Sequence, residues 1–116
     1  MRMWLVDPKH MCRKHLLGEH VELHMFLGAM LKGTSMSGFL ENNLLEPLSI
    51  HSRHEDLVRE MQVRGYNHHS PMSKTMVSYA VSLLSNAAQV TRIDRQAAAT
   101  ELFDRCPECR ARKARA

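Results

Sequence analysis

The sequence of 116 residues lacks a hydrophobic run long enough to cross a bilayer, and its start lacks the basic and apolar regions of a secretory signal. We therefore expect a cytoplasmic protein that makes no contact with a membrane. Cysteine is also scarce, because three residues, an odd number, do not support a disulfide framework. The thiols are expected to be reduced or to bind a metal.

Sequence features of β-structure are absent as well. No segment alternates apolar and polar residues over a sustained stretch, and no Asn-Gly or Asp-Gly pair marks a hairpin. Apolar residues recur instead at helical spacing along most of the chain, without an internal repeat. A chain of this length can bury a core as one domain. We predict an all-α fold, a single compact domain of about three to four helices.

Local features predict where the first helices begin and end. Asp7-Pro8 can cap a first turn, and a long helix is predicted over residues 13–32. A short helical or irregular connector over residues 39–48 follows. The next helix is predicted from the capping box Ser52-Arg53-His54-Glu55 to a stop at Arg64-Gly65.

Two further helices are predicted in the second half of the chain. Ser70-Pro71 starts one of them. Its predicted buried face consists of Met72, Met76, Tyr79, Ala80 and Leu83. The last helix begins near Thr91 or Asp94 and ends before Pro107. The chain thus divides into a helical domain, residues 1–105, and a basic tail with a Cys-x-x-Cys motif, residues 106–116.

The net charge of +4 is concentrated at the C-terminal end. Residues 105–116 carry five basic residues and one acidic residue, whereas residues 1–104 carry eleven of each sign. Such a tail either contacts phosphates in a salt-dependent manner or is a solvated, frayed terminus. A second basic cluster near the start consists of Arg2, Lys9, Arg13 and Lys14. Two basic patches beside one charged helix suit an anionic ligand.

Three ionisable residues share one face of the first predicted helix. At 100° per residue, His15, Glu19 and Glu22 fall with Phe26 within an arc of roughly 60°. The flanking positions are mostly apolar, so these groups are candidates for burial and for proton transfer. A solvated, ion-paired helical face is the alternative interpretation.

Two segments resemble a known enzyme family. The first is His15-Leu16-Leu17-Gly18-Glu19-His20-Val21-Glu22-Leu23, followed by Gly28-Ala29 and Lys32, and the second is Glu60-Met61-Gln62-Val63-Arg64-Gly65-Tyr66-Asn67. In this order they are similar to the first helix and the Arg-Gly-aromatic-Asn turn of the pyrimidine-dimer DNA glycosylases, the phage endonuclease V type. The resemblance implies an all-α fold with an extended N-terminal segment packed against the helices.

The resemblance also implies a nucleophile. In this family the α-amine of the first residue of the mature chain reacts, and a glutamate on the first helix assists it. An ungapped register from His15 matches the amine to Met1 and the glutamate to Glu22. Arg2 is expected to prevent removal of Met1, and the chemistry needs only an amine. An α-amine has an ordinary pKa of about 7.7 to 8.0, well below the value of about 10.4 for lysine.

The implied reaction removes a damaged base and then cleaves the strand. The amine attacks C1′, displaces the base and forms an imine with the opened deoxyribose, and β-elimination follows. His15 and Glu19 match positions in the same site and are candidate supports for proton transfer. The reaction requires no cofactor.

The implied partner is double-stranded DNA that contains a damaged or abasic nucleotide, which the family kinks to extrude a nucleotide. The candidate phosphate contacts are Arg2, Arg13, Lys14, Lys32 and Arg105. Val21 and Met25 stand where the phage enzyme has arginines, and residues 106–116 replace its aromatic tail. The sequence therefore leaves the preferred lesion open.

The cysteines offer an alternative site. Cys106 and Cys109 have the spacing of half a zinc site, and Cys12 with His15 could supply the other half. Such a site would compete with a catalytic use of His15. The alternative is a pair of reduced thiols at a frayed helix end.

Histidine spacing gives a weaker indication of a metal. His20 and His24 lie four residues apart on the first helix, and His68-His69 falls in a loop. Such histidines more often make surface hydrogen bonds, and no acidic residue completes a zincin pattern. From the sequence we predict no metal site.

The leading interpretation is a monomeric DNA repair glycosylase with abasic-site lyase activity, directed at pyrimidine dimers. Two alternatives stay open. One is a noncatalytic nucleic-acid-binding module with the same fold, and the other is a small zinc-stabilised interaction protein.

Overall fold

The computed structural model describes all 116 residues as one all-α domain without strands, as predicted. The seven helices are α1 (Arg13–Leu31), α2 (Ser37–Glu41), α3 (Ile50–Val63), α4 (Lys74–Ser82), α5 (Asn86–Gln89), α6 (Arg95–Arg105) and α7 (Pro107–Arg115). Single 3-10 turns at Pro8–His10 and Pro47–Ser49 precede α1 and α3. None of the helices combines the length and apolar character needed to cross a bilayer.

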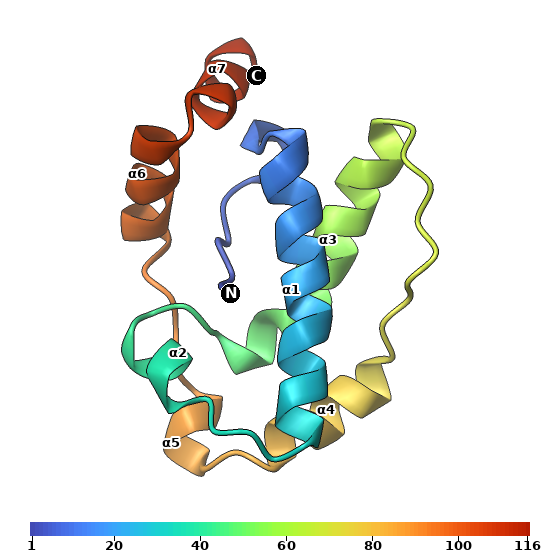
Figure 1. Ribbon diagram of the computed structural model, residues 1–116, viewed down its shortest axis with the longest axis vertical. Helices are drawn as coiled ribbons and strands as arrows, with labels where there is room; N and C mark the ends of the chain where they lie inside the picture. Colours follow the sequence, from blue (N-terminus) through green and yellow to red (C-terminus); the bar gives the residue numbers. More distant parts are fainter.

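Helices α1 and α3 form the centre of a flat molecule measuring 41 × 30 × 17 Å (Figure 1). Helix α4 packs against one end of α1, and α7 packs against α6 and the turn at Pro8–His10. Both central helices bury apolar residues, such as Leu23 and Phe26 on α1 and Leu57 on α3. They also bury several polar and charged side chains, which is where the candidate site begins.

The predicted extended N-terminal segment is present and lies between α1 and α6 (Figure 1). Met3 and Trp4 are buried, and the Met3 amide donates a hydrogen bond to the Leu44 carbonyl at 2.8 Å. Leu5 adopts a left-handed φ of 52°, which an L-residue other than Asn or Asp rarely does. The first six residues are therefore held firmly against the core.

The boundaries of α3 differ from the prediction at one end. The 3-10 turn at Pro47–Ser49 leads directly into the helix, which begins at Ile50. Ser52 lies inside it and its hydroxyl donates to the Ser49 carbonyl at 3.2 Å, so the predicted capping box is wrong. The predicted stop is confirmed, because Gly65 has a left-handed φ of 80°.

Helix α4 begins three residues later than Pro71, with Ser73 as its N-cap. The Ser73 hydroxyl accepts a hydrogen bond from the Met76 amide at 3.2 Å, which fixes this start. The buried face consists of Val77, Ala80 and Val81, whereas three members of the predicted face, Met76, Tyr79 and Leu83, are exposed. The prediction was wrong because Met72, although buried, precedes the helix and does not share its periodicity.

The C-terminal residues form a helix rather than a frayed end. Pro107 occupies the first turn of α7, and the Cys106 sulfur accepts the Cys109 amide at its N-terminus. Cys109 is fully buried and Cys106 nearly so. The first turn of α7 is therefore part of the core, and its remaining turns carry the basic residues.

A buried carboxylate joins the connector before α3 to the start of α6. Glu46 accepts hydrogen bonds from the Ile93 amide at 2.7 Å and from Arg95 at 2.8 Å, and also from the Ser49 hydroxyl. Burial favours the neutral acid, but these hydrogen bonds outweigh it and lower the pKa of Glu46 to about 2.

We predict that Glu46→Gln lowers the free energy of unfolding by about 2 kcal/mol at pH 7, because charge-assisted hydrogen bonds are lost. The pKa of Glu46 is lower in the folded than in the unfolded chain, so its contribution is complete above about pH 4.5 and declines as the pH falls toward 2. Urea unfolding at pH 7 and pH 3 should show a smaller difference at pH 3. Glu41→Gln, at an exposed position, is the control. An undiminished difference at pH 3 would contradict this account.

Candidate active site

The chain's α-amine lies beside a carboxylate of the central helix. The Met1 nitrogen is 3.4 Å from Glu22 Oε1, and the Arg2 amide donates a hydrogen bond to the same oxygen at 3.2 Å. The contact exists because α1 directs Glu22 toward the extended segment that Met3 and Trp4 anchor. Exposed fractions of 18% for the Met1 side chain and 28% for that of Glu22 leave the pair accessible from outside.

The helix surface next to this pair is open. Gly18, one turn before Glu22, carries no side chain, and a Cβ placed there would lie 4.0 Å from Glu22 Oε2. A glycine at this position therefore leaves room beside the carboxylate for another molecule.

Arg2 is held on the other side of the amine. Its guanidinium lies 3.7 Å from the centre of the Trp4 ring and pairs with Glu101 at 2.6 Å. Arg105 pairs with the second oxygen of the same carboxylate at 2.8 Å. The hydrogen bond from Arg2 is the largest of the effects that lower the pKa of Glu101. The structure thus brings together two of the predicted DNA contacts, Arg2 and Arg105.

Glu19 has a different environment from Glu22. Its carboxylate is buried and makes a two-pronged ion pair with Arg53 of α3, at 2.7 Å and 2.9 Å. Met11 Sδ is 3.2 Å from the same guanidinium. Glu19 therefore fastens α1 to α3, and none of its hydrogen bonds or ion pairs reaches the Met1 amine.

His15 lies among sulfur atoms. Its Nδ1 is 3.2 Å from Cys12 Sγ and 3.6 Å from Cys109 Sγ, and its ring packs edge-on against Trp4. Burial is the main reason that the pKa of His15 is lowered. His15 is thus linked to the Met1 end through Trp4, while its Nδ1 faces the cysteines.

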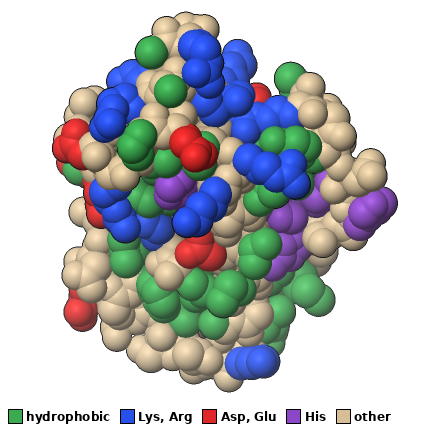
Figure 2. Space-filling view, turned by 45° about the horizontal axis from the view of Figure 1, so that its top comes forward, with side chains coloured by type: hydrophobic (Ala, Val, Ile, Leu, Met, Phe, Trp, Pro, Cys, Tyr) green, Lys and Arg blue, Asp and Glu red, His purple; other side chains and the backbone are tan.

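Basic side chains gather at the end of the molecule where α1 begins and α7 ends (Figure 2). The exposed members are Lys9, Arg13, Lys14, Arg105, Arg110, Lys113 and Arg115. Arg13 also stacks on Tyr66, which follows α3. Lys32 is exposed at the opposite end of α1, about 28 Å along the helix axis, and does not belong to this surface.

One comparison with known proteins found a match. The model of the pyrimidine dimer DNA glycosylase family matches residues 1–74, which include Met1, α1 and α3. The chain belongs to the pyrimidine dimer DNA glycosylase family. Comparisons with curated proteins and with solved structures gave no match. The matched region contains both Met1 and Glu22, whereas α7 lies outside it.

Membership in the pyrimidine dimer DNA glycosylase family indicates DNA as the substrate. Val21 and Met25, which stand where the phage enzyme has arginines, are about half exposed on α1. This face of α1 is therefore apolar where the phage enzyme offers positive charge.

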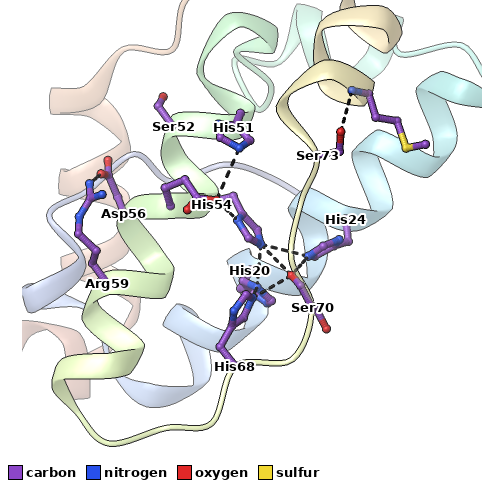
Figure 3. Close-up of polar contacts among 12 residues, drawn as sticks. His20, His24, His51, Ser52, His54, Asp56, Arg59, His68, Ser70 and Ser73 are labelled. Atoms are coloured by element: carbon purple, nitrogen blue, oxygen red, sulfur yellow. Dashed lines mark hydrogen bonds and ion pairs between the residues drawn. The ribbon is translucent and has the colours of Figure 1, made fainter.

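A cluster of four histidines was missed in the sequence (Figure 3). The Nε2 atoms of His20 and His54 are 3.1 Å apart, as are those of His20 and His68, and the His24 and His54 atoms are 3.2 Å apart. Burial, followed by the neighbouring histidines, lowers the pKa of His20 to about 4. His54 was assigned to a capping box, and only the fold brings it to the other three.

Two groups of side chains could therefore hold a metal ion. One consists of Cys12, His15, Cys106 and Cys109, and the other is centred on His20, His54 and His68. In each group the candidate ligand atoms lie within 4.8 Å of one another. Neither group includes Met1 or Glu22.

We predict that Glu19→Met lowers the free energy of unfolding by about 3 to 5 kcal/mol, because it leaves the buried Arg53 guanidinium without its counter-charge. Replacing both residues, as Glu19→Met with Arg53→Met, should recover most of this loss, because two apolar side chains can share the same space. Urea unfolding of the single and double variants measures the coupling. Additive losses in the double variant would show that the ion pair does not join α1 to α3.

Proposed function

We propose that this protein excises damaged bases from DNA and cleaves the resulting abasic sites, with the α-amine of Met1 as the nucleophile. The observation that carries the proposal is the 3.4 Å contact between the Met1 nitrogen and Glu22 Oε1. An amine and a carboxylate at this distance come within proton-transfer range, about 2.6 to 3.2 Å, after a small movement, and both imine formation and elimination require such a transfer.

The proposed reaction begins with the unprotonated amine. Its lone pair attacks C1′ of the target nucleotide, the glycosidic bond breaks, and the base leaves with a proton. Opening of the sugar ring breaks the bond between C1′ and O4′ and gives an imine between C1′ and the Met1 nitrogen. Loss of a C2′ proton then expels the 3′ phosphate by β-elimination, and water releases the protein by hydrolysing the imine.

Glu22 is the group proposed to move these protons. It accepts the proton that the amine loses, and its negative charge stabilises the cationic imine. Arg2 holds the segment through Trp4 and Glu101 and adds positive charge beside the amine. We assign positioning roles to His15 and Glu19, because their contacts run to Cys12 and Arg53.

DNA is proposed to bind across the basic end of the molecule. This surface supplies phosphate contacts from Arg13, Lys14 and α7, beside the accessible Met1 and Glu22. Extrusion of a nucleotide toward the amine would use the open helix surface at Gly18. The pyrimidine dimer is the proposed lesion, and an abasic site enters the same reaction at the imine step.

We predict that borohydride traps a covalent adduct between the untagged chain and a duplex with an abasic site, because the reduced imine is stable. The chain used should have Met1 verified as its first residue by mass spectrometry. An N-terminal extension should abolish the adduct. Glu22→Gln should reduce strand cleavage by about 10²- to 10⁴-fold with little change in DNA affinity.

Glu41→Gln, at an exposed position on α2, is the matched control and should cleave as the unaltered chain does. A duplex with a defined cyclobutane dimer tests base excision in parallel. DNA binding without any trapped adduct would overturn the enzyme proposal in favour of a noncatalytic binding module. An adduct that survives the N-terminal extension would remove Met1 from the mechanism.

A further inference from the structure

The three cysteines and His15 converge from opposite ends of the chain. Cys12 and His15 lie at the start of α1, whereas Cys106 and Cys109 lie at the start of α7. Cys12 Sγ is 3.8 Å from Cys106 Sγ, and His15 Nδ1 is 3.2 Å from Cys12 Sγ and 3.6 Å from Cys109 Sγ. Four ligands in a tetrahedron around zinc lie about 3.5 to 3.8 Å apart, because Zn–S and Zn–N bonds are about 2.3 and 2.0 Å long.

The backbone around this group favours thiolates. Cys12 is the N-cap of α1 and accepts the His15 amide, and Cys106 is the N-cap of α7 and accepts the Cys109 amide. The Cys12 amide in turn donates to Cys109 Sγ at 3.1 Å. Two helix N-termini and three amide donors therefore point at the sulfur atoms, which stabilises negative charge on them.

We propose that Cys12, His15, Cys106 and Cys109 form a structural zinc site that fastens α7 to the start of α1. Three thiolates and one imidazole are a ligand set of structural zinc sites, and all four ligand positions are filled by the protein. Zinc binding displaces the thiol protons. The site replaces the sequence-based expectation of no metal, and it stands whether or not the chain has lyase activity.

The test is metal analysis and cobalt substitution of the full chain. We expect bound zinc by elemental analysis and native mass spectrometry, and cobalt should give thiolate-to-metal charge-transfer absorption. Cys109→Ala should lose this equivalent of metal, while His10→Gln, a nearby histidine that packs on Phe103, should keep it.

Thiol alkylation provides a readout that does not depend on a variant. The three cysteines should resist alkylation in the metal-loaded chain and all three should react after chelation. A folded chain that stays free of zinc in excess zinc would overturn the proposal. Cobalt binding without thiolate absorption would overturn it as well.

A second, independent observation concerns the histidine cluster on the other side of α1 (Figure 3). His20 and His24 lie one turn apart on α1, His54 lies on α3, and His68 lies in the segment between α3 and α4. The Nε2 atoms of His24, His54 and His68 also lie 3.1, 3.1 and 2.8 Å from the Ser70 carbonyl oxygen. Four imidazole nitrogens and one carbonyl oxygen, from three segments of the chain, thus lie close together.

Hydrogen bonds between neutral rings leave one of these contacts without a donor, the one between His54 and Ser70. A neutral imidazole carries one N–H. In His54 this N–H is on Nδ1, because Nδ1 lies 2.9 Å from the Glu55 carboxylate, which accepts a hydrogen bond from it. Nε2 of His54 is then a lone pair directed at the Ser70 oxygen, which only accepts. Two acceptors thus lie 3.1 Å apart, and a cation bound to the His54 lone pair removes the conflict.

We infer that His20, His54 and His68 bind a second metal ion, a first-row divalent cation of the kind that imidazole prefers, with His24 beside the group. Ligand nitrogens around such an ion lie about 2.9 to 3.4 Å apart, and the Nε2 atom of His20 lies 3.1 Å from those of both His54 and His68. Glu55 on His54 Nδ1 is the outer carboxylate that commonly orients a ligating histidine. The ion would fasten residues 67–72, which make no backbone–backbone hydrogen bonds, to α1 and α3.

The neighbouring histidines offer a matched pair of variants. Zinc-supplemented wild-type chain should contain two metal equivalents, His68→Gln should contain one, and His69→Gln, at an exposed position, should contain two. His68→Gln should also increase the rate of hydrogen exchange or proteolysis in residues 67–72. Elemental analysis of chain from unsupplemented cells identifies the natural ion.

Cys109→Ala should remove the metal ion at the cysteine site, and His68→Gln should remove the one at the histidine site. The two proposals are therefore tested separately. The histidine proposal is overturned if His68→Gln retains as much metal as His69→Gln. It is also overturned if the wild-type chain never exceeds the equivalent held by the cysteines.

Discussion

The anchoring of the first residues against the core is the constraint on which the candidate site depends. A free chain end usually frays, and an α-amine that moves cannot be held at a carboxylate. Here Met3 and Trp4 are buried, and the Met3 amide is bonded to the Leu44 carbonyl at 2.8 Å. Arg2 and His15 pack on the two sides of this anchor through the Trp4 ring. Only because the segment is fixed does the Met1 nitrogen lie 3.4 Å from Glu22.

Helix α1 carries ionisable groups on several faces, and each has a separate partner. Glu22 faces the amine and Glu19 faces Arg53, while His20 faces the other histidines. A buried charge without a partner destabilises a small domain severely, so these contacts also fix the rotation of α1 against α3. Glu22, the carboxylate proposed to react, is the one left partly exposed, with 28% of its side chain accessible. In α1, Glu19 and His20 therefore contact other helices, whereas Glu22 is left for the proposed chemistry.

The sequence predicted those features that local chemistry determines. The extent of α1, the stop at Gly65 and the start of α6 near Asp94, one of two predicted positions, each depend on residues within one or two turns, and the structure has all three. The predicted start of α4 was wrong because Ser70 and Ser73, on either side of Pro71, could each cap the helix, and the structure uses Ser73. Spacing offered the two halves of the cysteine group as an alternative, but it did not show that they meet, and it missed the histidine cluster. Cys12 and Cys106 are 94 residues apart, so no local pattern indicates that they meet.

The amine and the cysteine group are connected through a single ring. Trp4 contacts the Arg2 guanidinium at 3.7 Å, and His15 packs against it edge-on. If His15 is a zinc ligand, its Nδ1 is fully used, and it acts on the amine only by holding Trp4 in place. Proton transfer then falls to Glu22 alone, as its position beside the amine already suggests. The proposed metal would thus add to the packing of the first turn of α7, and it would hold this helix close to the segment that carries the proposed nucleophile.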